Sequence, residues 1–316
     1  MKTLLAVILM AGLAPMAGAA GLDEARASRL PAIDAATIFS LIQDSRNSFP
    51  QPGPAGCGWI RLTSSQVEAL LKDRNPDIRK AGLRSARYFI QNNSINELAL
   101  KILKDKNERA DLRVEAARAL SYATGYLKVQ DAFIDLLKYG NEPRELRVMT
   151  YKALFSAVVT TLRCREFVLD AVDGDEKDRD ARLAAIWALF DSVGNIRPRD
   201  MLVDIVKGKE EDAARIEAIK SLYGAVGNYS VRDLFQDLAK DTRESKPVRI
   251  AAIKALSGAG SIVQSFLKEM IDHETDSEIK VAAIEASSPD MAAIRVYFHL
   301  GYQLADGTHV SPIERE

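Results

Sequence analysis

Apolar residues recur along this chain at the three- and four-residue spacing of amphipathic α-helices. The segment 111–120 (DLRVEAARAL) shows the pattern: Val114, Ala116, Ala117 and Leu120 fall on one side of a helical wheel drawn at about 100° per residue. Together they form one broad apolar face that needs to be buried. The pattern predicts an all-α protein made of short helices, each with one buried side.

The same ten-residue pattern occurs seven times. The copies begin at Asp77 (DIRKAGLRSA), Asp111 (DLRVEAARAL), Glu145 (ELRVMTYKAL), Asp180 (DARLAAIWAL), Ala213 (AARIEAIKSL), Pro247 (PVRIAAIKAL) and Glu278 (EIKVAAIEAS). Their shared basic residues lie 34, 34, 35, 33, 34 and 31 residues apart. A second apolar helix accompanies each copy, for example in residues 64–73, 95–105, 231–241 and 261–270. Because such periods are typical of solenoids, we predict an α-solenoid of about seven helical-hairpin repeats over residues 63–290.

The repeat resembles the HEAT repeat family, particularly the short HEAT-like units of phycobilisome lyases, whose second helix follows the pattern D-V-R-x-A-A-A-x-A-L. Residues 111–120 and 247–256 fit it closely, whereas the third copy is irregular at 149–151 (MTY) and the last ends in Ser287. Tetratricopeptide repeats share the period, but their Trp/Leu-Gly/Tyr helix and late Pro do not occur here. The resemblance implies an array that offers binding surfaces, and it leaves the function open because such arrays host unrelated activities.

Each copy carries one basic residue in the middle of its apolar face. These ladder residues are Arg79, Arg113, Arg147, Arg182, Arg215, Arg249 and Lys280. A buried guanidinium must be paired and hydrogen-bonded, because burying it alone is costly. The expected partners are acids at the helix starts, such as Asp77 and Asp111, and acids in the preceding turns, such as Asp73 and Glu176. We expect a structural ladder of ion pairs between repeats, as the resemblance also implies; an anion-binding ladder is the alternative.

A second column, five residues after each ladder position, falls on the exposed side of the wheel. It reads Arg84, Arg118, Lys152, Trp187, Lys220, Lys254 and Glu285, and its first six members are called the inner row below. In a HEAT-type array the second helix lines the concave side, so the resemblance places this row along a groove. Glu115 and Glu217 precede Arg118 and Lys220 by three residues, a spacing at which they neutralise part of the row.

The inner row has two interpretations. In the first, Trp187 anchors a protein or peptide partner, and Lys152 and Lys220 guide an acidic or carboxylate-bearing segment, because Trp and basic side chains are frequent at binding hot spots. In the second, the basic residues form a solvated face and Trp187 packs its ring between helices. The sequence does not decide between them.

Residues 1–19 have the pattern of a secretory signal peptide. Lys2 precedes an apolar run of eleven residues, 4–14, and residues 17–19 (AGA) offer the small side chains that signal peptidase needs. The run is too short for a membrane-spanning helix, which needs about twenty apolar residues. We expect cleavage near Ala19, export to the periplasm or the outside, and no membrane span in the rest of the chain.

Charge and composition narrow the range of partners. The chain has 43 Lys and Arg against 44 Asp and Glu, a formal net charge of −1, which gives no reason to expect a nucleic-acid partner. Three His and two Cys leave little material for a metal site. Cys57 and Cys164 are separated by about three predicted repeats, so we favour a buried free Cys164 over a disulfide between them.

The two ends differ from the array. Residues 20–62 carry two short predicted helices and the Pro/Gly-rich loop 49–59, which we interpret as an N-terminal cap on the first repeat. The Trp and Cys of that loop make it an alternative docking element. In residues 291–316 we predict a C-terminal capping helix, 291–304, followed by a polar tail.

A search for catalytic groups yields little. His273, His299 and His309 have no second His or Cys at metal-ligand spacing, and no Gly-rich phosphate loop, HExxH, G-x-S-x-G or CxxC motif occurs. We therefore expect an exported scaffold or adaptor that binds a protein or peptide through its concave face, without catalytic residues, cofactor or metal. The alternatives are an envelope enzyme, lyase- or hydrolase-like, with a cleft built on the repeats, and a structural role through oligomers.

Overall fold

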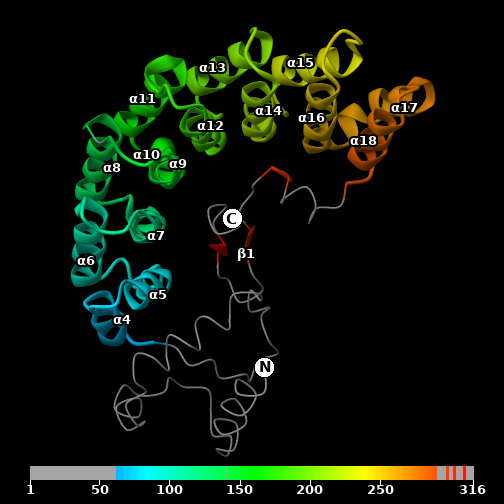
Figure 1. Ribbon diagram of the computed structural model, residues 1–316. Helices are drawn as coiled ribbons and strands as arrows, with labels where there is room; N and C mark the ends of the chain where they lie inside the picture. The colour runs from blue at the N-terminus through cyan, green and yellow to red at the C-terminus, as the bar shows by residue number, and fades with distance from the viewer. Residues whose placement is uncertain (1–61, 140, 290–296, 299–301, 304–308, 311–316) are drawn as a thin grey trace, which may run out of the picture. The chain divides into compact units, whose positions relative to one another are not determined.

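The computed structural model describes residues 62–139, 141–289, 297–298, 302–303 and 309–310 (Figure 1). The expected signal peptide, the N-terminal cap and the loop with Cys57 lie outside these residues. Contacts divide the described chain into two units. The first unit runs to Ala119, and the second begins at Leu120 and includes the described residues up to Gln303 and the strand 309–310.

The first unit consists of two helical hairpins. Its helices are α4 (Ser64–Leu71), α5 (Pro76–Ala86), α6 (Asn93–Lys104) and α7 (Ala110–Leu120, whose last residue belongs to the second unit). A capping box starts α4, because the Thr63 hydroxyl accepts from the Gln66 amide and the Gln66 side chain accepts from the Thr63 amide. The helices α4 and α5 approach closely at Gly82, where a Cβ would lie 2.9 Å from the Leu70 Cβ.

The second unit continues the same hairpin pattern. Its α-helices are α8 (Leu127–Tyr139), α9 (Arg144–Ala153), α10 (Phe155–Thr160), α11 (Leu162–Asp170), α12 (Arg179–Ala188), α13 (Ile196–Lys207), α14 (Asp212–Ser221), α15 (Tyr229–Lys240), α16 (Lys246–Leu256), α17 (Gln264–His273) and α18 (Ser277–Ser287). Short 3₁₀ segments follow four of the second helices, at Ser121–Ala123, Phe190–Ser192, Leu222–Ala225 and Ser257–Val263. Asn or Asp side chains cap several helix starts, as Asn228 does for α15 and Asp276 for α18.

Within the second unit the helices form two layers. The second helices of successive repeats pack on one another, α9 on α12, α12 on α14, α14 on α16 and α16 on α18. The first helices α13, α15 and α17 cover their partners α14, α16 and α18 from the other side. Figure 1 shows that α9, α12, α14, α16 and α18 line the inner side of the curve that this unit makes. The all-α solenoid predicted from the repeats is confirmed, and the described residues contain seven hairpins.

One repeat departs from the regular pattern. The extra short helix α10 precedes α11, and a π-helical turn, Ala171–Asp175, follows α11. Gly174 in this turn has φ 126°, a backbone conformation that residues with a Cβ rarely adopt. The turn therefore depends on glycine at this position, and it shapes the cavity described below.

The C-terminal end differs from the predicted capping helix. Tyr302–Gln303 forms strand β1 and pairs antiparallel with strand β2, His309–Val310. The predicted helix 291–304 is therefore wrong at Tyr302 and Gln303. A short apolar segment fits a helix or a strand by pattern alone, so the pattern did not reveal the strand pairing.

Among the described residues, the stretch Lys246–His273 is long and apolar enough to cross a membrane by length and composition. It contains two helices of the array rather than one, because α16 ends at Leu256 and α17 begins at Gln264. Gly260 between them has φ 59°, and more than half of the apolar window is buried against other helices. Packing within the array accounts for the apolar character of this stretch.

Candidate functional site

Five of the ladder residues connect their repeat to the next one. Their carboxylate partners lie in the turn of the following repeat, in the pairs Arg79–Glu108, Arg147–Glu176, Arg182–Glu210, Arg215–Glu244 and Arg249–Glu274. Several ladder guanidinium groups also donate to a carbonyl at the end of their own repeat's first helix, as Arg113 does to Leu103 and Arg215 to Val206. These are the ion pairs between repeats that the sequence predicts. The described residues give Lys280 no ion pair.

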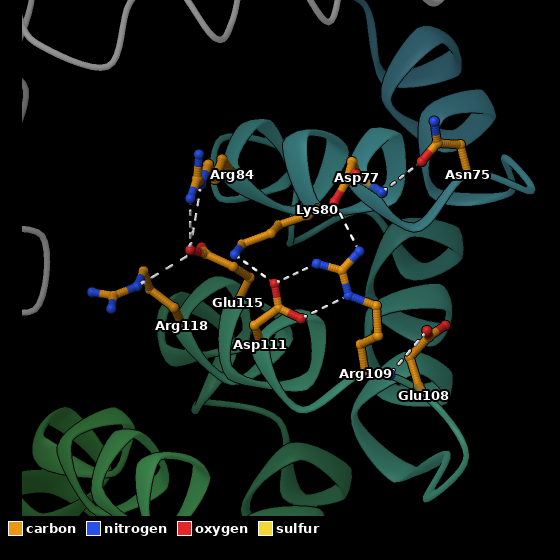
Figure 2. A network of polar contacts seen from close by, with 9 residues as sticks. All are labelled: Asn75, Asp77, Lys80, Arg84, Glu108, Arg109, Asp111, Glu115 and Arg118. Atoms are coloured by element: carbon orange, nitrogen blue, oxygen red, sulfur yellow. Dashed lines mark hydrogen bonds and ion pairs between the residues drawn. The ribbon is translucent and has the colours of Figure 1, made fainter.

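The partners of the ladder differ from the expected ones in two respects. Arg79 donates to the backbone carbonyl of Asp73 rather than to its carboxylate, and Glu176 pairs with Arg147 of the previous repeat rather than with a residue of the helix that follows it. The acids at the helix starts pair with cations on the surface instead, Asp77 with Arg109 and Asp111 with both Arg109 and Lys80 (Figure 2). These side chains point outward from the first helical turn, while the ladder guanidinium points toward the next repeat. Burial opposes ionisation of Asp111, but the hydrogen bonds from Arg109 and Lys80 outweigh it and lower the pKa of Asp111 to about 2.

The inner row of the first unit is neutralised by one carboxylate. Glu115 lies between Arg84, at 3.3 Å, and Arg118, at 3.8 Å (Figure 2). The contact with Arg118 is the three-residue pair predicted from the sequence. The Glu115 side chain is largely buried, so the two guanidinium groups share its charge in a partly desolvated place.

The inner row of the second unit consists of Lys152, Trp187, Lys220 and Lys254. Lys220 pairs with Glu217 at 3.9 Å, the second three-residue pair predicted from the sequence, and Lys254 pairs with Glu285 at 3.3 Å. The Lys152 ammonium lies 5.7 Å from the centre of the Trp187 ring, within the range of a cation–π contact. The row is therefore less basic than its residue types indicate.

Trp187 is not an exposed anchor, as the first interpretation of the inner row requires. Its side chain is only 5% exposed, and its ring lies against Phe155, at 5.9 Å between centroids, and Phe190, at 5.2 Å. Phe155 also stacks on Phe190. The second interpretation is the right one for this residue, because aromatic rings from a neighbouring column cover the indole.

That neighbouring column was missed by sequence reasoning. Phe155, Phe190 and Tyr223 stand three residues after Lys152, Trp187 and Lys220, and with Trp187 they form what is called the aromatic strip below. The signal that could have found them is an aromatic residue recurring at the repeat period, three residues after the inner row. The inner row of the second unit therefore packs against aromatic rings as well as carrying charge.

The aromatic strip continues into residues far along the chain. Phe298 stacks on Tyr223 with 4.1 Å between ring centroids, and Tyr297 lies edge-on to Phe298 at 4.8 Å. Lys220 and Lys254 each place an ammonium over the Tyr297 ring, at 5.0 and 4.9 Å from its centre. Burial, helped by the charge of Glu217, raises the pKa of Tyr297 to about 12, so its hydroxyl stays protonated at neutral pH.

A cavity of about 500 Å³ lies beside the irregular repeat, between α8, α9, α11 and the π-helical turn. Inside it Tyr151 donates a hydrogen bond to Glu176 at 3.0 Å, and Glu176 also pairs with Arg147 and accepts from the Asp178 amide. Burial and the charge of Glu176 raise the pKa of Tyr151 well above its usual value. The acid and the phenol are thus committed to structural contacts, and the phenol is held protonated.

One more surface feature follows the repeat period. Five apolar side chains at or just before the starts of first helices are each more than 60% exposed and are called the edge stripe below: Leu127, Leu162, Ile196, Tyr229 and Ile262. They lie 33 to 35 residues apart, in sequences such as Gly194-Asn195-Ile196 and Gly227-Asn228-Tyr229. Sequence reasoning missed this column because its members stand at or just before the first residue of a helix, outside the periodic pattern of the helix faces.

Cys164 lies in the core of the second unit. Its thiol is free and fully buried, and it donates a hydrogen bond to the Gln130 side chain. Burial raises the pKa of the Cys164 thiol to about 11, which makes it a poor nucleophile. In the described part of the chain, no group of three or more His, Cys, Asp or Glu side chains is placed to hold a metal ion.

Comparison with known families agrees with the repeat geometry. Residues 199–288 match the family model described as HEAT repeats. This segment contains three ladder positions, and the repeats before it carry the same ladder at the same interval. Residues 199–288 are therefore similar to HEAT repeats. A comparison with curated proteins gives no match.

Two solved structures are similar to this chain at low sequence identity. YibA of Escherichia coli is 16% identical with a TM-score of 0.45, and the alignment covers 83% of this chain and 99% of that one. The complex of CpcE and CpcF of phycocyanin lyase from a Nostoc species is also 16% identical, with a TM-score of 0.43 and coverage of 76% and 98%. Neither likeness bears on what this protein binds.

Proposed function

We propose that this protein is a non-catalytic scaffold that binds a segment of another protein along the inner layer of its second unit. The observation that carries the proposal is an aromatic binding surface formed by Tyr223, Lys220 and Lys254, called the seat below. Two consecutive aromatic residues of the chain itself, Tyr297 and Phe298, lie on it. HEAT arrays present broad surfaces of this kind, and aromatic contacts flanked by cations are typical of binding hot spots.

The charges of the inner row define the partner more closely. Glu217 and Glu285 hold Lys220 and Lys254 in loose pairs, so an acidic segment of a partner competes with them rather than meeting free cations. Partly exposed pairs of this type contribute little stability, and they exchange partners at small cost. We therefore propose a partner that combines aromatic side chains with an acidic flank.

An enzyme is the weaker alternative. The cavity near α11 is the best candidate for an active site, but its Tyr151 and Glu176 are already committed to each other and to Arg147. A general base or nucleophile needs a perturbed pKa near the working pH, and burial moves the pKa of Tyr151 in the opposite direction. These contacts favour a structural role for the cavity groups.

We also propose that the scaffold works outside the cytoplasm. The support is the order of Lys2, the apolar run 4–14 and Ala-Gly-Ala in residues 1–19. A chain purified from its own host with Ala20 at its N-terminus supports export. A full-length chain recovered only from the cytoplasm contradicts it.

The binding proposal is tested by affinity capture from envelope extract. The triple variant Lys152→Glu/Lys220→Glu/Lys254→Glu reverses the charge of the inner row and keeps the buried Trp187 side chain, although it removes the Lys152 contact with that ring. Its matched control, Lys207→Glu/Lys240→Glu/Lys268→Glu, makes the same change in net charge on the first helices α13, α15 and α17.

We expect wild type and control to capture the same partner and the inner-row variant to capture at least tenfold less, with helical content unchanged by circular dichroism. Equal capture by the two triple variants removes the inner row as the binding surface.

A further inference from the structure

The inner side of α14 and α16 holds an aromatic side chain between two cations. Lys220 belongs to α14 and Lys254 to α16, so neighbouring repeats each contribute one ammonium to the Tyr297 ring. Ammonium groups are attracted to the face of an aromatic ring, and the attraction strengthens where water is excluded. The seat exists only because the repeat period places the two lysines at equivalent positions of adjacent helices.

The second aromatic residue has a deeper seat. Phe298 is only 2% exposed and stacks on Tyr223, which follows α14. Gly258 makes this possible: a Cβ at that position would lie 2.8 Å from the Val226 Cγ1 and 3.0 Å from the Tyr223 Cε2. The glycine therefore leaves room for the Tyr223 ring against which Phe298 packs.

The length of chain between the array and this pair permits the contact. α18 ends at Ser287, and Tyr297 follows ten residues later. Two helix layers separate α18 from α14, a distance of about 20 Å at about 10 Å per layer. A chain of ten residues spans about 33 Å when extended, so the pair reaches its seat from its own chain.

We infer that Tyr223, Lys220, Lys254 and Gly258 form a binding site for two consecutive aromatic side chains, and that the chain's own Tyr297-Phe298 pair occupies it. The site is thus closed by an internal ligand, and a partner segment with adjacent aromatic residues binds there only by displacing that pair. This second statement rests on the proposed function; the aromatic site itself does not.

The first test supplies the internal ligand as a separate peptide. The probe is a fluorescein-labelled peptide of residues 289–303 (PDMAAIRVYFHLGYQ), and the receptor is the full mature chain, either wild type or Tyr297→Ala/Phe298→Ala. We expect the variant with the emptied seat to bind the peptide at least tenfold more tightly than wild type by fluorescence anisotropy. Introducing Lys220→Glu/Lys254→Glu into the emptied variant should weaken its binding of the peptide at least tenfold. Replacing both aromatic residues of the peptide by Ala should have the same effect.

Equal binding by wild type and the emptied variant overturns the inference, and so does no binding by an emptied variant that keeps its helical content. A second measurement leaves the pair in place and so does not depend on how well the emptied variant folds. Lys220→Gln/Lys254→Gln weakens the seat, so trypsin should cut after Arg295 at least tenfold faster than in wild type. Lys207→Gln/Lys240→Gln serves as the control, and an unchanged cleavage rate contradicts the inference.

Partner capture separates this inference from the proposed function. If both hold, the emptied variant captures more partner than wild type. Peptide binding by the emptied variant without capture of any partner supports the aromatic site and contradicts the proposed function. Equal capture by wild type and the emptied variant contradicts the claim that the partner displaces the Tyr297-Phe298 pair. This holds even if the inner-row variant shows that the partner binds the same face.

Discussion

Replacing Trp187 with Ala lowers the free energy of unfolding by about 3 to 5 kcal/mol, the usual cost of truncating a buried aromatic side chain. The indole is 95% buried and lies against Phe155 and Phe190, so its removal leaves a cavity that these two rings fill only in part. The Lys152 ammonium loses its aromatic partner as well. Urea unfolding followed by circular dichroism measures the change.

Tyr229→Ala is the matched control for this prediction. Tyr229 is 71% exposed in the same unit, so its truncation should change the free energy of unfolding by less than about 0.5 kcal/mol. A Trp187→Ala variant as stable as this control contradicts the buried aromatic strip and restores Trp187 as a surface anchor. The prediction also explains why capture experiments must not use Trp187: a loss of binding would report damage to the core.

Replacing Arg215 with Met lowers the free energy of unfolding by about 2 to 3 kcal/mol, because removing one member of a buried ion pair leaves the other charge uncompensated. Arg215 donates to Glu244 at 2.7 Å through one Nη and at 3.0 Å to the Val206 carbonyl through Nε, and both side chains of the pair are largely buried. Arg243→Met is the control, since Arg243 pairs with Asp241 in the neighbouring turn but is almost fully exposed. We expect the control to change stability by less than about 0.5 kcal/mol.

The pH dependence of the Arg215 effect provides a second check. The hydrogen bond from Arg215 lowers the pKa of Glu244 below its ordinary value of 4.5. A carboxyl whose pKa is lower in the folded state stabilises the fold above its unfolded pKa, and that contribution is lost as the pH falls through the folded pKa. The difference between wild type and Arg215→Met should therefore be full at pH 7 and shrink below about pH 4.5. A difference independent of pH contradicts the ion pair as its cause.

The fold was predictable from the sequence because the repeat carries its own register. A basic ladder residue, Arg in six copies and Lys in the last, recurs every 31 to 35 residues in the middle of an apolar stripe, and only stacked helical hairpins bury such a face. The partners of the ladder were not predictable in the same way. Whether Arg147 meets an acid of its own helix or Glu176 of the next turn depends on how successive repeats are rotated, which a single-helix wheel does not contain.

The candidate site was predictable only in outline. The wheel places Trp187 on the open arc of its own helix, but the rings that cover it come from Phe155 and Phe190, outside that helix. The seat of Phe298 on Tyr223 joins residues 75 positions apart and follows no repeat. Local periodicity predicts which face of a helix is open; it does not predict which distant segment covers it.

Hydrogen–deuterium exchange of residues 20–316, alone and bound to the captured partner, tests the central claim most directly. We predict that the partner slows exchange in α12, α14 and α16, the helices of the inner layer, and leaves α13 and α15 unchanged. An amide in a helix exchanges only when the backbone opens locally, and a bound segment makes that opening less frequent. Protection confined to the starts of α11, α13 and α15, where the edge stripe lies, would contradict the inner layer as the binding surface.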